Sequence, residues 1–414
     1  MINWFYDCYQ ILNKVYGEGA FIKQAISSSF IEEKNRALTI KTCYGVLERD
    51  IELSFYLKSL APKTPKLAIR TILKVAFYAI KYLNKKPYAV LDNAVELTKK
   101  LGKAGAGGFV NATLRKFTKT QFDLPKEKAE NLSVKHSYPL FAVKELIDYY
   151  GEERVDEIIK VQAVDTCLSF YETDGETYLK GQNTQFEKTV FDGVYTVKNF
   201  TRNEDYDKGV YTYQALGSVA ICNGVEGGNT LLDCCSAPGG KAIRLSHKFN
   251  SVTAWDIHSH RVELINEYAT RMHRENIITA VQDSKVYNPE FNEKFDAVLC
   301  DAPCSGLGVV NDNPDIKLNR DSESVTELVN EQKAILKTVA NYVKVGGYLY
   351  YSTCSVLPRE NIERIKEFIK MDDRFVIEET DSLLPHKKIE NTLQFLPDIS
   401  GGLGFYFAKL KRIK

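Results

Sequence analysis

The strongest constraint on the fold of this 414-residue chain is a change of rhythm near residue 211. Beyond that point, short apolar runs alternate with longer segments of helical period. The runs lie at residues 231–233, 252–255, 277–281, 295–300 and 347–351, and residues 261–274 and 325–343 are the clearest helical segments between them. Strands that alternate with helices form a parallel sheet covered by helices on both faces. We therefore expect an α/β domain over residues 211–414, closed by an antiparallel edge hairpin of residues 374–379 and 404–410.

The first 120 residues show only the helical period. Helices are expected at residues 36–60, 67–83, 90–101 and 109–117, with proline- or glycine-containing loops between them. Amphipathic helices on short loops form a bundle, so we assign residues 1–125 to an all-α domain. Residues 126–210 hold a helix that opens near Pro139, a second helix after Gly151, and β-like runs at 168–171 and 194–197. They are assigned to a small α+β connector.

Charge is distributed unevenly along the chain. The formal net charge is +1, but residues 1–125 carry +10 and the remainder −9. A uniformly basic nucleic-acid-binding protein is therefore excluded. The basic N-terminal domain suits an anionic partner, although a solvated helical surface explains the charge equally well. The sequence contains no apolar run of membrane-spanning length and does not begin with a secretory signal, which predicts a cytoplasmic protein.

The nine cysteines contain neither a C-x-x-C pair nor a cysteine/histidine set at zinc-binding spacing. This usage is typical of a reducing compartment, where most free thiols are small core residues. We expect that role for Cys8, Cys43, Cys167 and Cys222, and we expect no metal site.

Polar residues follow the first three strands of the expected sheet, at the edge where such sheets bind their ligands. The loop after the first strand consists of Cys235, Ser236, Ala237, Pro238, Gly239, Gly240 and Lys241. It fits neither a phosphate-binding nor a dinucleotide-binding loop, but its glycines let the backbone approach a ligand closely. The second strand ends at Asp256 and the third near Asp283. A single aspartate in this place is usually a helix cap, but the series favours a nucleoside site.

Two cysteines follow the next two strands. The fourth strand leads into Asp301-Ala302-Pro303-Cys304, and the fifth leads into Thr353-Cys354-Ser355. Because both turns are polar and open toward the nucleoside site, two functional thiols are a better interpretation than two core residues. The reducing compartment disfavours a disulfide between them. A metal would need more ligands than these turns supply.

Together these motifs resemble the signatures of RNA cytosine-C5 methyltransferases, above all those of the bacterial Sun/Fmu group, which acts on 16S ribosomal RNA. The resemblance covers most of the chain. It rests on residues 235–241, 301–306 and 353–355, and it extends to Pro314-Asp315-Ile316-Lys317, Gln332, Pro358 and Glu360-Asn361. Residues 111–115 resemble the N-terminal domain of that group, which is similar to the transcription factor NusB.

The resemblance implies three domains. Residues 1–125 would form a NusB-like RNA-binding bundle, residues 126–210 an RRM-like connector, and residues 211–414 a Rossmann-like methyltransferase domain that uses S-adenosylmethionine. The loop of residues 235–241 would bind this cofactor, with Asp256 at its ribose, Asp283 near its adenine and Asp301 close by.

The resemblance also implies catalytic roles. Cys354 would add to C6 of a cytosine as the nucleophile, which makes C5 reactive toward a methyl sulfonium. Cys304 would assist product release. Asp301 would offset charge near N3 and N4 by donating a proton or hydrogen bond, which requires a raised pKa. Lys241 would lower the pKa of the thiol.

The chain departs from the family pattern at several positions, namely Gln214-Ala215, Ser236, Asn311-Asp312-Asn313 and Leu403-Gly404-Phe405-Tyr406. The family usually has a basic residue before Pro314, and its absence here would weaken an RNA contact. Two alternatives remain: the same chemistry on transfer RNA or another RNA, and a non-catalytic RNA-binding or transcription-related protein. The bundle favours ribosomal RNA, and the presence of both thiols argues against the non-catalytic alternative. We expect a monomer that binds small-subunit ribosomal RNA and neither a membrane nor a metal.

Overall fold

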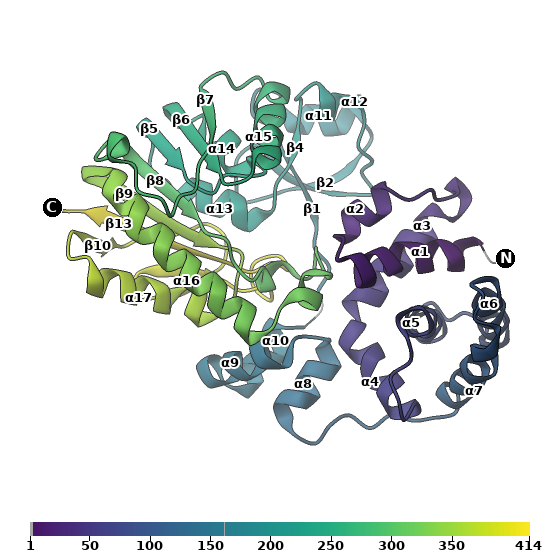
Figure 1. Cartoon of the computed structure of the whole chain (residues 1–414). Helices are drawn as coiled ribbons and strands as arrows, with labels where there is room; N and C mark the ends of the chain where they lie inside the picture. The colour runs from purple at the N-terminus through teal and green to yellow at the C-terminus, as the bar shows by residue number, and fades with distance from the viewer. Residues whose placement is uncertain (1–2, 161) are drawn as a thin grey trace. The chain divides into compact units, whose positions relative to one another are not determined.

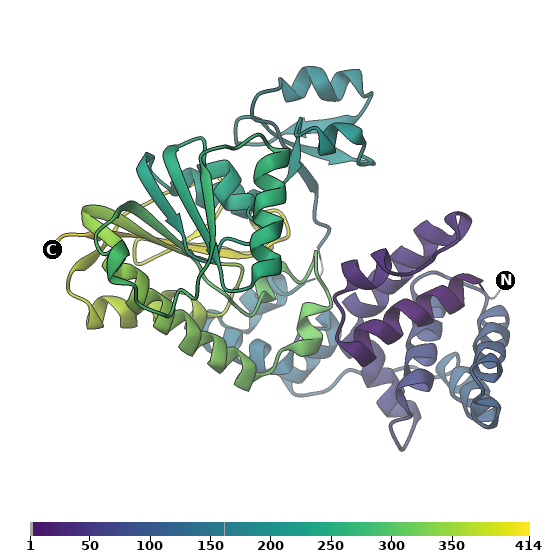
Figure 2. The same ribbon diagram turned by 45° about the horizontal axis from the view of Figure 1, so that its top comes forward.

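The computed structural model describes residues 3–160 and 162–414, in which a helical part precedes a mixed α/β part (Figure 1 and Figure 2). Contacts along the backbone divide the chain into two compact units. Unit 1 comprises Met1–Val161 and Asn313–Asp321, and unit 2 comprises Gln162–Asp312 and Ser322–Lys414. Within the described ranges, no helix combines the length and the apolar character needed to cross a membrane.

Unit 1 is helical, as the sequence predicts. Its helices are α1 (Asn3–Glu18), α2 (Ile22–Ser27), α3 (Glu33–Glu48), α4 (Asp50–Leu60), α5 (Leu67–Lys81), α6 (Pro87–Lys100), α7 (Gly107–Phe117), α8 (Lys128–His136), α9 (Leu140–Tyr150) and α10 (Glu152–Ile158). The single helix expected over residues 36–60 is wrong in one respect. The backbone leaves the helical conformation at Arg49 (φ −103°, ψ 18°), so two helices form in its place.

The core of unit 1 is built around α5, which is buried along most of its length. Its residues Ile72 to Ala76 include no exposed side chain, and Phe77 stacks on Phe117 of α7 with ring centroids 4.2 Å apart. Burial of a side chain of this size contributes about 1.5–3 kcal/mol. The apolar face of α5 therefore explains the helical period from which the bundle was predicted.

A strap from the second half of the chain, residues 313–321, packs into unit 1. The backbone N–H of Ile22, at the start of α2, donates to Asp315 Oδ2 at 3.0 Å. Lys317 Nζ donates to the carbonyl of Glu48 at 2.6 Å and to that of Ser137 at 2.8 Å. These carbonyls lie at the ends of α3 and α8, where helices leave acceptors without intrahelical partners. The Pro314–Lys317 motif therefore supplies hydrogen-bond partners to backbone groups at the ends of three helices.

Unit 2 is organised around a nine-stranded sheet with the strand order β11-β12-β13-β9-β8-β5-β6-β7, in which β10 also pairs with β13. The strands are β5 (Gly228–Asp233), β6 (Phe249–Asp256), β7 (Ile277–Val281), β8 (Phe295–Asp301), β9 (Val343–Thr353), β10 (Phe375–Glu378), β11 (Lys387–Ile389), β12 (Thr392–Phe395) and β13 (Phe405–Arg412). Strands β5 to β9 pair in parallel, and β13 is antiparallel to β9.

Helices cover both faces of this sheet, which confirms the expected fold class. They are α13 (Leu216–Gly224), α14 (Gly240–Leu245), α15 (Ser259–Arg271), α16 (Ser322–Val339) and α17 (Ile362–Met371). Because side chains alternate along a strand, Leu231 packs in the cluster formed with α13, α14 and α15, whereas Leu232 packs in the cluster formed with α16 and α17. Figure 1 shows α16 and α17 together on one side of the sheet.

The C-terminal hairpin differs from the expectation. Strand β10 does pair with β13, with Phe375 opposite Arg412, but β13 lies between β9 and β12 and is not an edge strand. The short strands β11 and β12 were missed because they are only 3 and 4 residues long. Helix α16 also ends at Val339, before the expected residue 343, because Val343 already belongs to β9.

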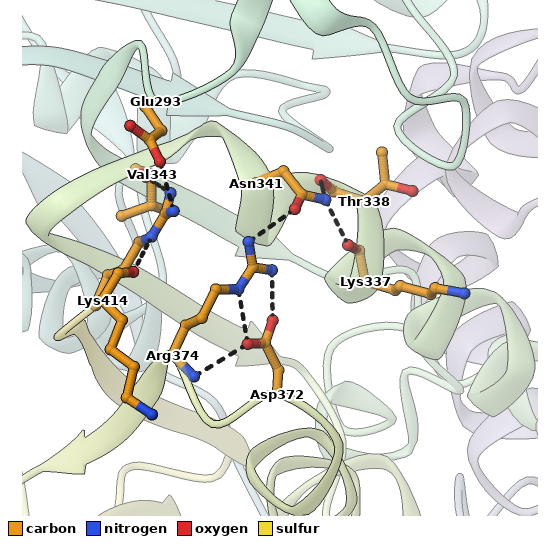
Figure 3. A network of polar contacts seen from close by, with 9 residues as sticks. Glu293, Lys337, Thr338, Asn341, Val343, Asp372, Arg374 and Lys414 are labelled. Carbon is orange, nitrogen blue, oxygen red and sulfur yellow. Dashed lines mark hydrogen bonds and ion pairs between the residues drawn. The ribbon is translucent and has the colours of Figure 1, made fainter.

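Polar contacts fix the chain around β10 and β13 (Figure 3). The Arg374 guanidinium is bidentate to Asp372, at 2.8 Å and 2.6 Å, and donates to Asn341 Oδ1 at 2.9 Å. Arg412 donates to Glu293 at 2.6 Å and to the carbonyl of Val343. These arginines are therefore engaged in holding the C-terminal strands.

The connector region is divided between the units. Helices α8, α9 and α10 belong to unit 1, and the breaks expected at Pro139 and Gly151 are confirmed. In unit 2, an antiparallel sheet of order β2-β3-β1-β4 contains β1 (Thr166–Ser169), β2 (Gln185–Lys188), β3 (Val194–Lys198) and β4 (Thr212–Tyr213), accompanied by α11 (Gly175–Gly181) and α12 (Glu204–Asp207). The three-domain division at residues 125 and 210 stays a prediction.

The strap makes the stability of unit 1 depend on pH in a defined direction. Burial lowers the pKa of Lys317 from 10.5 to about 8. Above this pKa the folded lysine is neutral while the unfolded one still binds a proton, so the stability contributed by Lys317 rises between the two values. In a Trp255→Phe background, where Trp4 reports unfolding in urea, wild type should gain about 2 kcal/mol over Lys317→Met between about pH 7 and pH 9.5. The matched variant Lys63→Met, at an exposed lysine, should show no such change, and a flat difference for Lys317→Met would contradict the burial effect.

Candidate functional site

A cavity of about 320 Å³ opens in unit 2 at the carboxyl ends of the parallel strands. Its walls come from the segments that follow β5, β6, β7, β8 and β9, together with α16. The lining residues are Cys234, Cys235, Ala237, Asp256, Ile257, His258, Arg261, Gln282, Asp283, Ser284, Asp301, Ala302, Pro303, Cys304, Glu331, Ile335 and Cys354. All strand ends singled out in the sequence therefore contribute to one cavity.

The loop after β5 is folded tightly between neighbouring strands. The N–H of Ser236 donates to the carbonyl of Trp255 at 2.8 Å, and the N–H of Gly239 donates back to the carbonyl of Ser236 at 2.7 Å. Gly239 has a φ of +104°, and a Cβ atom there would lie 3.3 Å from Ile265. Of this loop, Cys235 and Ala237 line the cavity. The other residues of the loop are not among the lining residues.

The aspartates after β6 and β7 reach the cavity and also cap the local backbone. Asp256 accepts from the N–H of His258 at 3.1 Å and lies 3.3 Å from Arg261, and its side chain is only 4% exposed. Asp283 accepts from the N–H of Lys285 at 2.9 Å. Both aspartates thus cap the local backbone and also line the cavity. Each carboxylate keeps acceptor capacity toward the cavity.

Asp301, at the end of β8, is surrounded by donors. Lys241 Nζ donates to one carboxylate oxygen at 2.7 Å, and the Ser352 hydroxyl donates to the other at 2.7 Å. Burial opposes the Lys241 charge, but Asp301 outweighs it and raises the pKa of Lys241. Both carboxylate oxygens of Asp301 therefore accept hydrogen bonds here, and the expected donation toward a cytosine stays a prediction.

A second carboxyl group, Asp233, lies at the end of β5 and has a raised pKa. Burial, and next the negative charge of Asp301, raises the pKa of Asp233 to about 7. Among the described residues, neither carboxylate oxygen of Asp233 nor the Ser236 hydroxyl has a hydrogen-bond partner. The signal for Asp233 in the sequence is its position at the end of the apolar run Leu231-Leu232.

The two thiols meet at one wall of the cavity. Cys304 Sγ and Cys354 Sγ are 3.1 Å apart, and the N–H of Cys354 donates to Cys304 Sγ at 3.3 Å. The hydrogen bond to Cys354, followed by burial, raises the pKa of Cys304 well above 9.0. In this contact either thiol can donate to the other. The remaining cysteines expected in cores, at positions 8, 43, 167 and 222, are buried.

The charged groups of the cavity suit S-adenosylmethionine. This cofactor is cationic at its sulfonium and amino groups, and the acidic residues Asp256, Asp283 and Asp301 line the cavity. Asp256, at the end of β6, keeps acceptor capacity for ribose hydroxyls. Nowhere in residues 3–160 and 162–414 do three or more histidine, cysteine or acidic side chains form a group that could hold a metal ion.

Comparison with known proteins decides the family. Residues 221–411 match the family described as 16S rRNA methyltransferase RsmB/F, and residues 8–119 match the NusB family. The chain is 30% identical over 432 residues to the probable ribosomal RNA small subunit methyltransferase B of Bacillus subtilis, which covers 97% of this chain and 95% of the relative. The chain belongs to the RsmB/F methyltransferase family. It is an RNA methyltransferase that uses S-adenosylmethionine and methylates ribosomal RNA, which confirms the enzyme class and the cofactor expected from the sequence.

Solved structures confirm the fold of this RsmB/F family member. The structure titled "Crystal Structure of PH0851" has a TM-score of 0.84, with 19% sequence identity and coverage of 99% of this chain and 98% of that chain. A methyltransferase homolog from Pyrococcus horikoshii has a TM-score of 0.60, with 20% identity and coverage of 70% of this chain and all of that one. At these identities the similarity concerns the fold alone.

The departures from the family pattern have local explanations. Ser236 is buried in the loop after β5, and Leu403 is buried in the core on the α13 side of the sheet. The Asn311 side chain donates to the carbonyl of Gly402 at 2.8 Å. These residues therefore contribute to the structure of unit 2.

Asp256 provides a test of the cofactor site. Charge-assisted hydrogen bonds contribute about 1.5–3 kcal/mol, so Asp256→Ala should weaken S-adenosylmethionine binding at least about tenfold by titration calorimetry. The matched variant is Asp296→Ala, which removes a carboxylate near the start of β8, where Asp296 pairs with Lys344. Binding should survive in that variant. Equal affinities for both variants would refute the role of Asp256.

Proposed function

We propose that this enzyme methylates C5 of a cytosine in 16S ribosomal RNA through a covalent bond between Cys354 and C6. The observation that carries the proposal is the pair of thiols 3.1 Å apart at the wall of the cavity that also holds the loop after β5. Cytosine C5 is a poor nucleophile, and addition of a thiolate to C6 divides one difficult step into two easier ones. The family description and the names of the relatives support the choice of 16S ribosomal RNA.

The surroundings of the thiols support Cys354 as the nucleophile. The raised pKa of Cys304 keeps that thiol protonated, and a hydrogen bond from it stabilises a thiolate on Cys354. Product release requires a base to remove the C5 proton while the bond between C6 and Cys354 breaks and returns its electrons to the Cys354 sulfur. Cys304 lies beside Cys354 and can be this base once its own proton has passed to solvent. The expected effect of Lys241 on the thiol stays a prediction, because its ammonium group is paired with Asp301.

Asp301 is proposed to orient the target base. Its carboxylate accepts hydrogen bonds from Lys241 and Ser352, and remaining lone pairs can accept from the N4 amino group of cytosine. Such a contact favours cytosine over uracil, which has no amino group at that position. S-adenosylmethionine supplies the electrophilic methyl group when bound. The residues of the chain hold the base, the thiolate and the proton.

The RNA must present an unstacked base to this cavity, which favours single-stranded or loop RNA. We propose that the bundle, with a net charge of +10 over residues 1–125, binds phosphates without reading the sequence. Its similarity to the NusB family supports this role. The cytoplasmic location, the monomeric state and the lack of a membrane partner are part of the same proposal.

The two thiols should behave differently when each is replaced. Cys354→Ala removes the nucleophile, so neither a covalent adduct nor methyl transfer should occur. Cys304→Ala removes help with release, so the methylated base should stay bonded to Cys354. Each variant is incubated with RNA and cofactor and analysed on a denaturing gel, where a shifted protein–RNA band is expected for Cys304→Ala alone. A band for Cys354→Ala would reverse the roles, and full activity of both variants would exclude the thiol mechanism.

The target can be identified by bisulfite sequencing of RNA from a strain that lacks the gene. A 16S ribosomal RNA cytosine that resists conversion in the parent strain should become convertible in the deletion strain. Return of the gene should restore resistance, and return of the Cys354→Ala variant should not. Loss of resistance in transfer RNA, with unchanged 16S ribosomal RNA, would instead select the transfer-RNA alternative.

A further inference from the structure

A buried carboxylate lies behind the thiols and does not line the cavity. Glu360 belongs to the short helix η6 (Pro358–Glu360), and its side chain is fully buried. One carboxylate oxygen accepts from the N–H of Ser305 at 2.7 Å and from Gln332 Nε2 at 3.2 Å. The other accepts from the hydroxyls of Ser305 and Ser355, each at 2.5 Å. The mechanism derived above uses none of these contacts.

The donors to Glu360 come from both thiol-bearing turns. Ser305 follows Cys304 directly in the chain, and Ser355 follows Cys354 directly. Glu360 therefore holds each turn one residue away from its thiol. Gln332 adds a second link to the first turn, because its amide also donates to the carbonyl of Pro303 at 2.9 Å.

The same hydroxyls continue the network into the backbone of each turn. Ser305 Oγ accepts from the N–H of Leu307 at 3.3 Å, and Ser355 Oγ accepts from the N–H of Leu357 at 3.0 Å. The two hydroxyl oxygens are 3.2 Å apart. One carboxylate thus fixes the conformation of two turns that are 50 residues apart in sequence.

The energetics favour only the arrangement in which both turns are close. A buried carboxylate is costly unless hydrogen bonds replace its lost hydration, and it offers about four acceptor sites. Here four neutral donors fill them. If one turn moved away, its donors would be lost and part of a buried acceptor would be left without partners, which is unfavourable.

From this geometry we propose that Glu360 is a positioning residue that holds the Cys304 and Cys354 turns together, so that the two thiols act on the same base. The inference rests on the proposed function for its catalytic meaning. The position of the thiols themselves can be tested without RNA or methyl transfer. Glu360 also carries a charge that acts on the site, since its carboxylate adds to the effects of Cys354 and of burial that raise the pKa of Cys304.

The test uses the reaction of the two thiols with each other. The diazene oxidant diamide takes two electrons and two protons from a pair of thiols, which yields a disulfide and the corresponding hydrazine. Thiols held in contact react as an intramolecular pair, whereas small displacements slow such reactions strongly. The rate is measured on the full-length protein by mass spectrometry of the Cys304–Cys354 cross-linked peptide.

Wild type should form this disulfide rapidly, and Glu360→Ala should form it at least about tenfold more slowly. Glu360→Gln keeps the length and two acceptor sites of the side chain, so it should recover part of the rate. The matched control is Glu52→Gln, which changes a buried, hydrogen-bonded glutamate of unit 1 and should leave the rate unchanged. Binding of S-adenosylmethionine in calorimetry shows that a variant is folded. If Glu360→Ala does not bind the cofactor, the disulfide rate of Glu360→Gln is the test.

Two further readouts separate positioning from a general loss of structure. In methyl transfer, Glu360→Gln should lower kcat while the KM for S-adenosylmethionine stays within about twofold, because the side chain lines no part of the cofactor cavity. The pH at which iodoacetamide alkylates Cys304 should fall in Glu360→Gln, since a negative charge that opposes the thiolate is gone. Ser355→Ala keeps the negative charge of Glu360, so it should lower the pH of Cys304 alkylation less than Glu360→Gln does.

An unchanged disulfide rate in both Glu360 variants would overturn the proposal, as would a wild-type protein whose thiols do not cross-link. Either result is independent of the methylation mechanism. Full methyl transfer by Cys354→Ala would instead contradict the proposed function. The positioning role of Glu360 would then still be decided by the disulfide rate.

Discussion

The parallel pairing of β8 with β9 is the interaction on which the site depends. In this register Asp301 lies opposite Ser352, and the N–H of Ala302 donates to the carbonyl of Ser352 at 2.9 Å. Each thiol lies a few residues beyond that point, so the two turns leave the sheet side by side. A slip of one residue would turn every side chain of β9 to the opposite face. The register of backbone hydrogen bonds therefore decides that Cys304 and Cys354 meet.

Charged groups at the strand ends around the cavity are arranged mainly in pairs. Lys241 neutralises Asp301, and Arg261 lies beside Asp256, which lowers the cost of keeping these groups away from bulk water. Asp233 is different, because its carboxylate has no partner among the described residues. Burial and the neighbouring Asp301 raise its pKa to about 7, so its charge changes in the neutral range.

The sequence was sufficient for the strands, the covering helices and the convergence of the strand ends, because each depends on a local pattern. For example, the consecutive apolar residues Leu231 and Leu232 indicate a strand that is buried on both faces of the sheet. The site residues Asp256, Asp283, Asp301, Cys304 and Cys354 could be placed at one edge for the same reason.

What the sequence did not contain was the choice of partners over long distances. Nothing local in the sequence shows that Lys241 and Ser352 are the partners of Asp301. Glu360 was noticed only as part of a motif, since its donors lie up to 55 residues away along the chain. The Pro314–Lys317 motif likewise gave no sign that its partners are helix ends near residues 22, 48 and 137.

The strap also has a consequence for synthesis of the protein. A domain made of one continuous segment can complete its folding as soon as that segment leaves the ribosome. Unit 1 is discontinuous in sequence. The ends of α2, α3 and α8 can bind Asp315 and Lys317 only after residues 162–312 of unit 2 have been translated. The bundle therefore emerges first but reaches its final set of hydrogen bonds late. Its maturation on the ribosome is coupled to the appearance of the catalytic half.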